Sequence, residues 1–193
     1  MKCAGCPDNK CYLEGKDCTG GRFDKDELYA DEEDLKLLKV SSWLEGSFYM
    51  ELTRLEEVIR FSTEMGYKRL GLAFCIGLTA EAELMRKILS RDFKVSSVCC
   101  KITGTEKETW GLKHIMEGRF EATCNPVVQA RILNADKTDL NLIVGLCIGH
   151  DILFTKHSKA PVSTFIVKDR VLAHNPAGAL YSKYYRAKKF KVE

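Results

Sequence analysis

The sequence is poor in the features that mark membrane, fibrous and nucleic-acid-binding proteins. No apolar run approaches the roughly 18 residues of a membrane-spanning helix. Of 193 residues only 4 are proline, while 45% are hydrophobic and 30% charged, which excludes disordered and collagen-like classes. The net charge is only +3, and the segment 183–193 alone supplies +4 of it, so the remainder carries −1. We therefore expect one compact domain, with or without a small appendage, and no broad nucleic-acid-binding surface.

Several familiar catalytic and export signals are also absent. The sequence contains no P-loop, no G-x-G-x-x-G, no G-x-S-x-G and no H-E-x-x-H pattern. The opening residues MKCAGC show the small-residue-cysteine ending of a lipoprotein signal, but no apolar stretch precedes it. We expect a cytoplasmic protein without a membrane partner, and chemistry other than that of nucleotide, serine-hydrolase or zinc-protease sites.

Cysteine, in contrast, is abundant. Nine cysteines in a reducing compartment indicate metal ligation or catalysis before disulfides. They form two groups, one within residues 1–18 and one spread through the body of the chain. The first group is Cys3, Cys6, Cys11 and Cys18, and the second is Cys75, Cys99, Cys100, Cys124 and Cys147.

The first group has the spacing C-x2-C-x4-C-x6-C and no histidine beside it. Residues 1–23 are too polar and glycine-rich to bury a core, so a bound metal is the expected source of their order. All-thiolate sites select zinc or iron-sulfur clusters. The spacing matches neither the bacterial ferredoxin pattern nor two separate C-x2-C knuckles. We expect an iron-sulfur cluster, with zinc as the alternative; four free thiols are the weaker interpretation because exposed thiols oxidise readily.

The remaining residues, 24–193, predict an α/β domain. Helices are expected over 24–44 and 48–65, followed by two strand-helix-strand units at 69–101 and 140–167 whose turns, FCIG and LCIG, lie 72 residues apart. Such units imply right-handed crossovers and parallel pairing, and their strands lack the polar alternation of a half-exposed sheet. The sequence therefore predicts a mostly parallel sheet. A helix is expected from Pro126, a short antiparallel strand over 170–174 and a last helix over 177–185.

Cys75 and Cys147 occupy equivalent places in the two units, each at the carboxyl end of a strand and just before a helix. Ligands bind at that edge of open α/β sheets, and a helix N-terminus stabilises a thiolate. Cys100, at the end of the second strand, and Cys124, before the helix that Asn125 caps, could reach the same crevice. We take these four cysteines as a candidate cofactor site; the alternative is that each is a small buried hydrophobe.

Two further groups could serve this edge. His150 lies three residues after Cys147, where it could act as an acid, base or ligand, or face solvent. Asp169, Arg170, His174 and Asn175 form a polar group that could orient an anionic ligand or simply build a solvated turn.

The N-terminal cysteines, CNPVVQARILN at 124–134, GLCIGHDILF at 145–154 and APVSTFIVKDRVLAHNP at 160–176 together carry a resemblance. The chain resembles, over nearly its whole length, an uncharacterised cysteine-rich family of predicted metal-binding proteins found mainly in anaerobic bacteria and archaea. The resemblance implies metal binding at Cys3, Cys6, Cys11 and Cys18, is consistent with the candidate cofactor site, and implies nothing about substrate.

Two classes of function follow from these patterns. The first is an iron-sulfur protein, either a redox or sulfur-handling enzyme or an electron carrier, whose partner is a small-molecule substrate or an electron-transfer protein. The second is a zinc-stabilised binding or regulatory module without catalysis. The colour and metal content of anaerobically purified protein distinguish the two.

Overall fold

The computed structural model describes residues 1–24 and 27–192, and its chain divides into two units, Met1–Ser47 and Phe48–Glu193. The first unit holds a short 3₁₀ turn at Cys3–Gly5, the single-turn helix α1 (Lys10–Leu13) and the long helix α2 (Glu32–Ser47).

The helix expected over 24–44 thus starts later than predicted, because Asp31 Oδ1 accepts the N–H groups of Glu33 and Asp34 at 2.9 and 3.0 Å and caps it there. Residues 25 and 26 lie outside the described residues. The predicted boundary after residue 23 stays a prediction.

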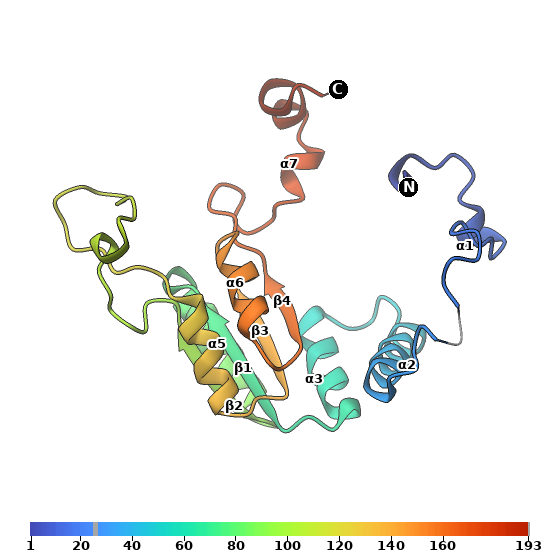
Figure 1. The fold of residues 1–193 in the computed structure, drawn as a ribbon, viewed down its shortest axis with the longest axis horizontal. Coiled ribbons are helices and arrows are strands. Elements are labelled where there is room, and N and C mark those ends of the chain that lie inside the picture. Colours follow the sequence, from blue (N-terminus) through green and yellow to red (C-terminus); the bar gives the residue numbers. More distant parts are fainter. Residues whose placement is uncertain (25–26, 193) are drawn as a thin grey trace. The chain divides into compact units, whose positions relative to one another are not determined.

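The second unit is built on a four-stranded parallel sheet of order β2-β1-β3-β4 (Figure 1). Its strands are β1 (Arg69–Phe74), β2 (Lys94–Cys99), β3 (Leu140–Val144) and β4 (Val162–Ile166). The central strands β1 and β3 are buried on both faces, as their unbroken apolar runs predict. The predicted α/β class and parallel sheet are confirmed.

Helices cover both faces of this sheet. Helices α3 (Arg54–Met65) and α4 (Thr79–Leu89) pack on one face, where Val58, Met85 and Leu89 meet Leu70 and Leu142. Helices α5 (Pro126–Ala135) and α6 (His150–His157) lie side by side over the other face (Figure 1). Among the described residues no helix is long and apolar enough to cross a membrane.

The two predicted strand-helix-strand units leave the centre of the sheet in opposite directions. One runs from β1 through α4 to the edge strand β2, and the other from β3 through α6 to the edge strand β4. The chain therefore reverses its direction of winding between β1 and β3, and ligands bind at such switch points in open α/β sheets. Cys75 follows β1 and Cys147 follows β3, so both lie at the carboxyl edge of the central strand pair.

Local sequence signals explain the helix ends and the close packing. Thr53 and Glu56 form a reciprocal capping box at the start of α3, and Gly66, with φ 79°, ends that helix in a left-handed conformation. Gly71 in β1 allows a close approach between neighbouring strands, because a Cβ there would overlap the side-chain oxygen of Asn141.

The connection from β2 to α5 is long, and the Lys107 ammonium is one of the groups that hold it. The Lys107 ammonium pairs with Glu121 at 2.5 Å and donates to the Lys113 carbonyl at 2.9 Å, while the Ile115 N–H donates to Glu121 at 2.7 Å. Both side chains of the ion pair are largely buried, at 14% and 20% exposure.

The prediction of a short antiparallel strand over 170–174 is wrong. This segment is a series of turns, because Asp169 Oδ1 accepts the N–H groups of Val171 and Leu172 and so bends the backbone back on itself. Ala173 and His174 complete the bend with φ values of 48° and 64°. The last helix is also shorter than expected: α7 (Gly178–Tyr181) stops at Ser182, whose backbone is extended, before a π-helical turn at Tyr185–Phe190.

Candidate thiol site

Three cysteines from separate segments meet at the carboxyl edge of the sheet: Cys75 after β1, Cys100 after β2 and Cys124 before α5. We call them the cysteine cluster. The Cys100 and Cys124 sulfur atoms are 3.7 Å apart, and the Ile76 N–H points to the Cys100 sulfur at 3.4 Å. Cys75 and Cys100 are buried, and Cys124 is half-buried.

Backbone hydrogen bonds fix these segments beside one another. The N–H of Cys100 donates to the Phe74 carbonyl at 2.9 Å, which continues the pairing of β1 with β2 beyond the strand ends. The Asn125 N–H donates to the Cys100 carbonyl at 2.8 Å, and the Asn125 side chain caps α5. Strand pairing therefore brings Cys75 to Cys100, and the start of α5 brings Cys124 to the same place.

The cluster holds two thiolates around one thiol. The Cys100 thiol, with the Gly77 N–H and the Lys168 ammonium, lowers the pKa of Cys75 to about 5 in spite of burial. The same thiol, helped by His150, lowers the pKa of Cys124 to about 4. Hydrogen bonding to these two neighbours raises the pKa of Cys100, so the proton of the cluster resides there.

His150, the first residue of α6, is half-buried beside Cys124. Hydrogen bonding to the Cys124 sulfur and the charge of that thiolate raise the pKa of the imidazole despite burial. The raised pKa favours the protonated form of His150 beside the Cys124 sulfur, and a cysteine paired with a histidine is an arrangement that activates cysteine nucleophiles and positions a proton donor. This placement supports the predicted role of His150 without testing it.

Cys147, the fourth predicted member, contacts a different partner. The Arg170 guanidinium donates a hydrogen bond to the half-exposed Cys147 sulfur at 3.0 Å. Cys147 is the largest cause of the raised pKa of Arg170, and the charges of Cys75 and Cys124 add to it. Arg170 is therefore the group that connects Cys147 electrostatically with the cysteine cluster.

Sequence patterns did not identify two residues of this site, Lys168 and Gln129. Lys168 follows β4 and reaches Cys75. Its position at the carboxyl end of a parallel strand could have predicted that it belongs to this site. The fully buried Gln129 on α5 donates its amide N–H groups to the carbonyls of Phe74 at 3.2 Å and Val98 at 2.7 Å. It thereby joins the strand ends that carry Cys75 and Cys100.

Cys99 has separate contacts. Its half-buried sulfur accepts the Lys101 N–H at 3.5 Å. It offers an adjacent cysteine as a control for substitutions in the cluster.

The N-terminal cysteines lie mostly exposed in the first unit. The Cys6 thiol donates to Asp8 at 3.3 Å, and desolvation followed by the neighbouring Cys11 and Cys6 raises the pKa of Cys18. Three of the four predicted ligands are thus close enough to interact. In the part of the chain that the structure describes, no three His, Cys, Asp or Glu side chains are already arranged to hold a metal ion.

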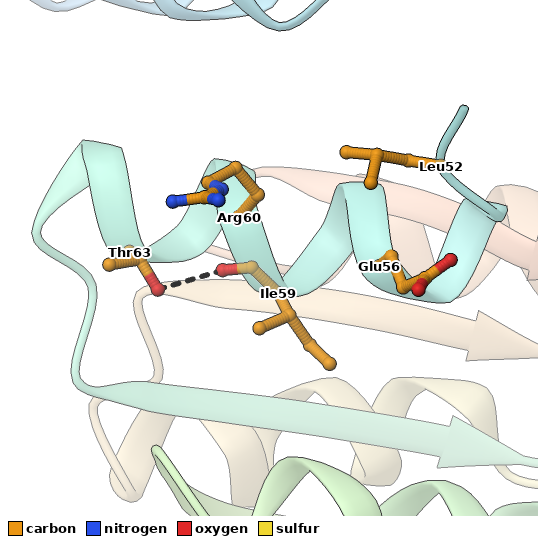
Figure 2. Close-up of a pocket in the computed structure, with 5 residues that line it drawn as sticks. All are labelled: Leu52, Glu56, Ile59, Arg60 and Thr63. Atoms are coloured by element: carbon orange, nitrogen blue, oxygen red, sulfur yellow. Dashed lines mark hydrogen bonds between the residues drawn. The ribbon is translucent and has the colours of Figure 1, made fainter. Parts of the chain in front are cut away.

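A surface pocket of about 290 Å³ lies elsewhere, along α3 (Figure 2). Its lining residues are Leu52, Glu56, Ile59, Arg60 and Thr63. None is a cysteine or histidine; Glu56 belongs to the capping box, and the Thr63 hydroxyl donates to the Ile59 carbonyl at 2.9 Å. Glu56 and Thr63 therefore serve the helix, and the Arg60 guanidinium lies over the Phe48 ring at 5.2 Å.

Comparison with known proteins gives a family without a described activity. A family model described as "Protein of unknown function (DUF1847)" matches residues 19–165, a range that contains the cysteine cluster, Cys147 and His150. An uncharacterised protein of Methanocaldococcus jannaschii is 57% identical over 189 residues, which is 97% of each chain.

One solved structure also matches, a mutant N-acetyl-L-ornithine transcarbamylase complexed with carbamyl phosphate and N-succinyl-L-norvaline. It is 15% identical with a TM-score of 0.27, and the match covers 75% of this chain but only 41% of that one. A likeness this low carries no argument about fold or function.

Proposed function

The chain belongs to the DUF1847 family, and because the description of that family names no activity, we propose from the thiol site that it is a cytoplasmic metal-binding redox protein. In this proposal the cysteine cluster holds one metal centre at the sheet edge. Cys3, Cys6, Cys11 and Cys18 hold a second centre that orders the N-terminal segment. The supporting observation is the meeting of three thiols from three segments at a position where α/β proteins bind ligands.

The chemistry of the donors fits a soft metal. Thiolates are the form that binds metal, and the pKa values of Cys75 and Cys124 keep both thiols deprotonated near neutral pH. A tetrahedral ion with metal-sulfur bonds of about 2.3 Å holds its sulfurs about 3.8 Å apart, close to the 3.7 Å between Cys100 and Cys124. Binding would release the Cys100 proton and draw Cys75 and His150 or Cys147 toward this pair.

The proposed cofactor is an iron-sulfur cluster, with zinc as the second candidate. The proposed ligands are the four N-terminal cysteines, the three of the cysteine cluster, and Cys147. Neither the N-terminal group nor the cluster requires a histidine ligand, which suits iron-sulfur chemistry and one-electron transfer. The separation of Cys100 and Cys124 is the observation that favours zinc, because a single tetrahedral ion accepts two sulfurs at that distance whereas a cubane binds each cysteine at a different iron.

The surroundings of the cluster suit a reacting partner. The side chain of Arg170 is exposed, Lys168 and His150 are half-buried, and all three lie beside cysteine sulfurs. The basic side chains of Arg170 and Lys168 could hold an anionic group of a small molecule, and His150 could donate a proton to it. The proposed partner is therefore a small-molecule substrate or an electron-transfer protein.

Metal analysis of anaerobically purified protein tests this proposal. We expect brown protein with absorbance near 400 nm if iron-sulfur is correct, and colourless protein with stoichiometric zinc if the second candidate is. Replacing Cys75 and Cys124 by serine should remove one centre, replacing Cys6 and Cys11 should remove the other, and the control Cys99→Ser should remove neither. Metal-free wild-type protein, or equal metal content in all variants, would refute the proposal.

A further inference from the structure

Cys100 and Cys124 differ in access to solvent although their sulfur atoms touch. Cys100 is 1% exposed, whereas Cys124 is half-buried at the start of α5. The sulfurs are 3.7 Å apart, and the hydrogen bond from Asn125 N–H to the Cys100 carbonyl keeps the two backbone segments adjacent. The sulfurs are therefore close enough for side-chain rotation to move them toward the roughly 2.05 Å of a disulfide bond.

We propose that Cys124 and Cys100 form a dithiol that reduces small-molecule disulfides, with Cys124 as the attacking sulfur and Cys100 as the resolving sulfur. This activity needs no metal and goes beyond the function proposed above. An accessible cysteine backed by a buried partner is the arrangement that thiol-disulfide exchange requires, since the mixed disulfide must form outside and be resolved from within.

The reaction proceeds in two displacements. The Cys124 thiolate attacks one sulfur of the disulfide R–S–S–R, forms a mixed disulfide and releases one thiolate, which takes a proton to become R–SH. Cys100 then loses its proton and attacks the Cys124 sulfur, which expels the second thiolate as R–SH. In sum, R–S–S–R and two cysteine thiols give two R–SH and one Cys100–Cys124 disulfide, so the substrate gains the two electrons that the protein loses.

The charges around Cys124 indicate the class of disulfide. Lys101, His150 and the exposed Arg170 all interact electrostatically with the Cys124 sulfur. Lys101 also donates to the Ala122 carbonyl, two residues before Cys124, which holds its ammonium at the site. Disulfides that carry carboxylates, such as oxidised glutathione, fit this basic rim better than neutral or cationic ones.

Peptide mapping of the full chain after treatment with oxidised glutathione tests the inference. Trypsin separates residues 95–101, which hold Cys99 and Cys100, from residues 120–131, which hold Cys124. We expect these two peptides to become cross-linked in wild-type protein and in the control Cys99→Ser. The cross-link should disappear in Cys100→Ser, and this variant should instead keep one glutathionyl group on the 120–131 peptide. Cys124→Ser should show neither the cross-link nor a glutathionyl group on that peptide.

The treatment is run on protein as purified and again after chelation, so that its outcome is independent of the metal analysis. A bound metal should slow the reaction, and chelation should restore it. A glutathionyl group that persists on Cys124 of chelated wild-type protein, or a cross-link that survives in Cys100→Ser, would overturn the inference and leave the metal proposal intact. Cross-linking in protein that never contains metal would support it while refuting the proposed metal function.

Discussion

The pH dependence of Cys124 alkylation tests the electrostatics of the site most directly. An ordinary thiol is protonated near neutral pH, so its alkylation rate rises about tenfold with each pH unit. The pKa of Cys124 is lowered to about 4 by Cys100 first and His150 second, so this thiol is already deprotonated near neutral pH. We expect its alkylation rate to stay flat between about pH 5 and pH 8 and to fall only below about pH 5.

The magnitude follows from two opposing effects. At about pH 5 the lowered pKa gives Cys124 about 10⁴ times more thiolate than a thiol with the ordinary pKa of 9.0, but a Brønsted coefficient of about 0.45 makes each thiolate about 200 times less nucleophilic. The net rate is about 50-fold higher at about pH 5, and the two rates are similar near about pH 7. The difference therefore appears in the pH profile and disappears at neutral pH.

The assay is iodoacetamide labelling of chelated, reduced protein, followed over time through the peptide 120–131, whose single cysteine is Cys124. Cys100→Ala should raise the midpoint of the profile most, because Cys100 is the largest cause of the shift, and His150→Gln should raise it less. Cys99→Ser serves as the control and should leave the profile unchanged. A wild-type rate that climbs tenfold per pH unit would refute the charge arrangement.

Two further predictions concern stability. Gly71→Ala should lower the free energy of unfolding by about 1–3 kcal/mol in urea titrations, because the added methyl overlaps a buried side chain, whereas Gly77→Ala, with 3.5 Å to its nearest neighbour, should be almost neutral. Lys107→Met should expose residues 101–122 to proteases, because it leaves the Glu121 carboxylate without its cation. Lys87 forms an exposed ion pair with Glu83, so Lys87→Met serves as the control and should change little. Equal protease sensitivity in Lys107→Met and Lys87→Met would contradict this explanation.

The sequence by itself determined the class of the fold and the edge on which the cysteines gather. Strands buried on both faces need unbroken apolar runs, and that requirement is local, so β1 and β3 were predictable from their composition. Parallel strands place their carboxyl ends at one edge, so the positions of Cys75, Cys100 and Cys147 along the chain suffice to assign them to that edge. The start of α5 was also predictable, because Asn125 and Pro126 supply its cap and first turn.

Only the tertiary structure decided which cysteines touch. Strand order is a long-range property: pairing of β2 with β1 put Cys100 beside Cys75, and the start of α5 added Cys124. Arg170 met Cys147 because Asp169 closed a turn by accepting backbone N–H groups, where the local pattern had predicted a strand. These contacts join residues distant in sequence, and their energies depend on packing and on charges brought together by folding, which hydrophobic periodicity along the chain does not encode.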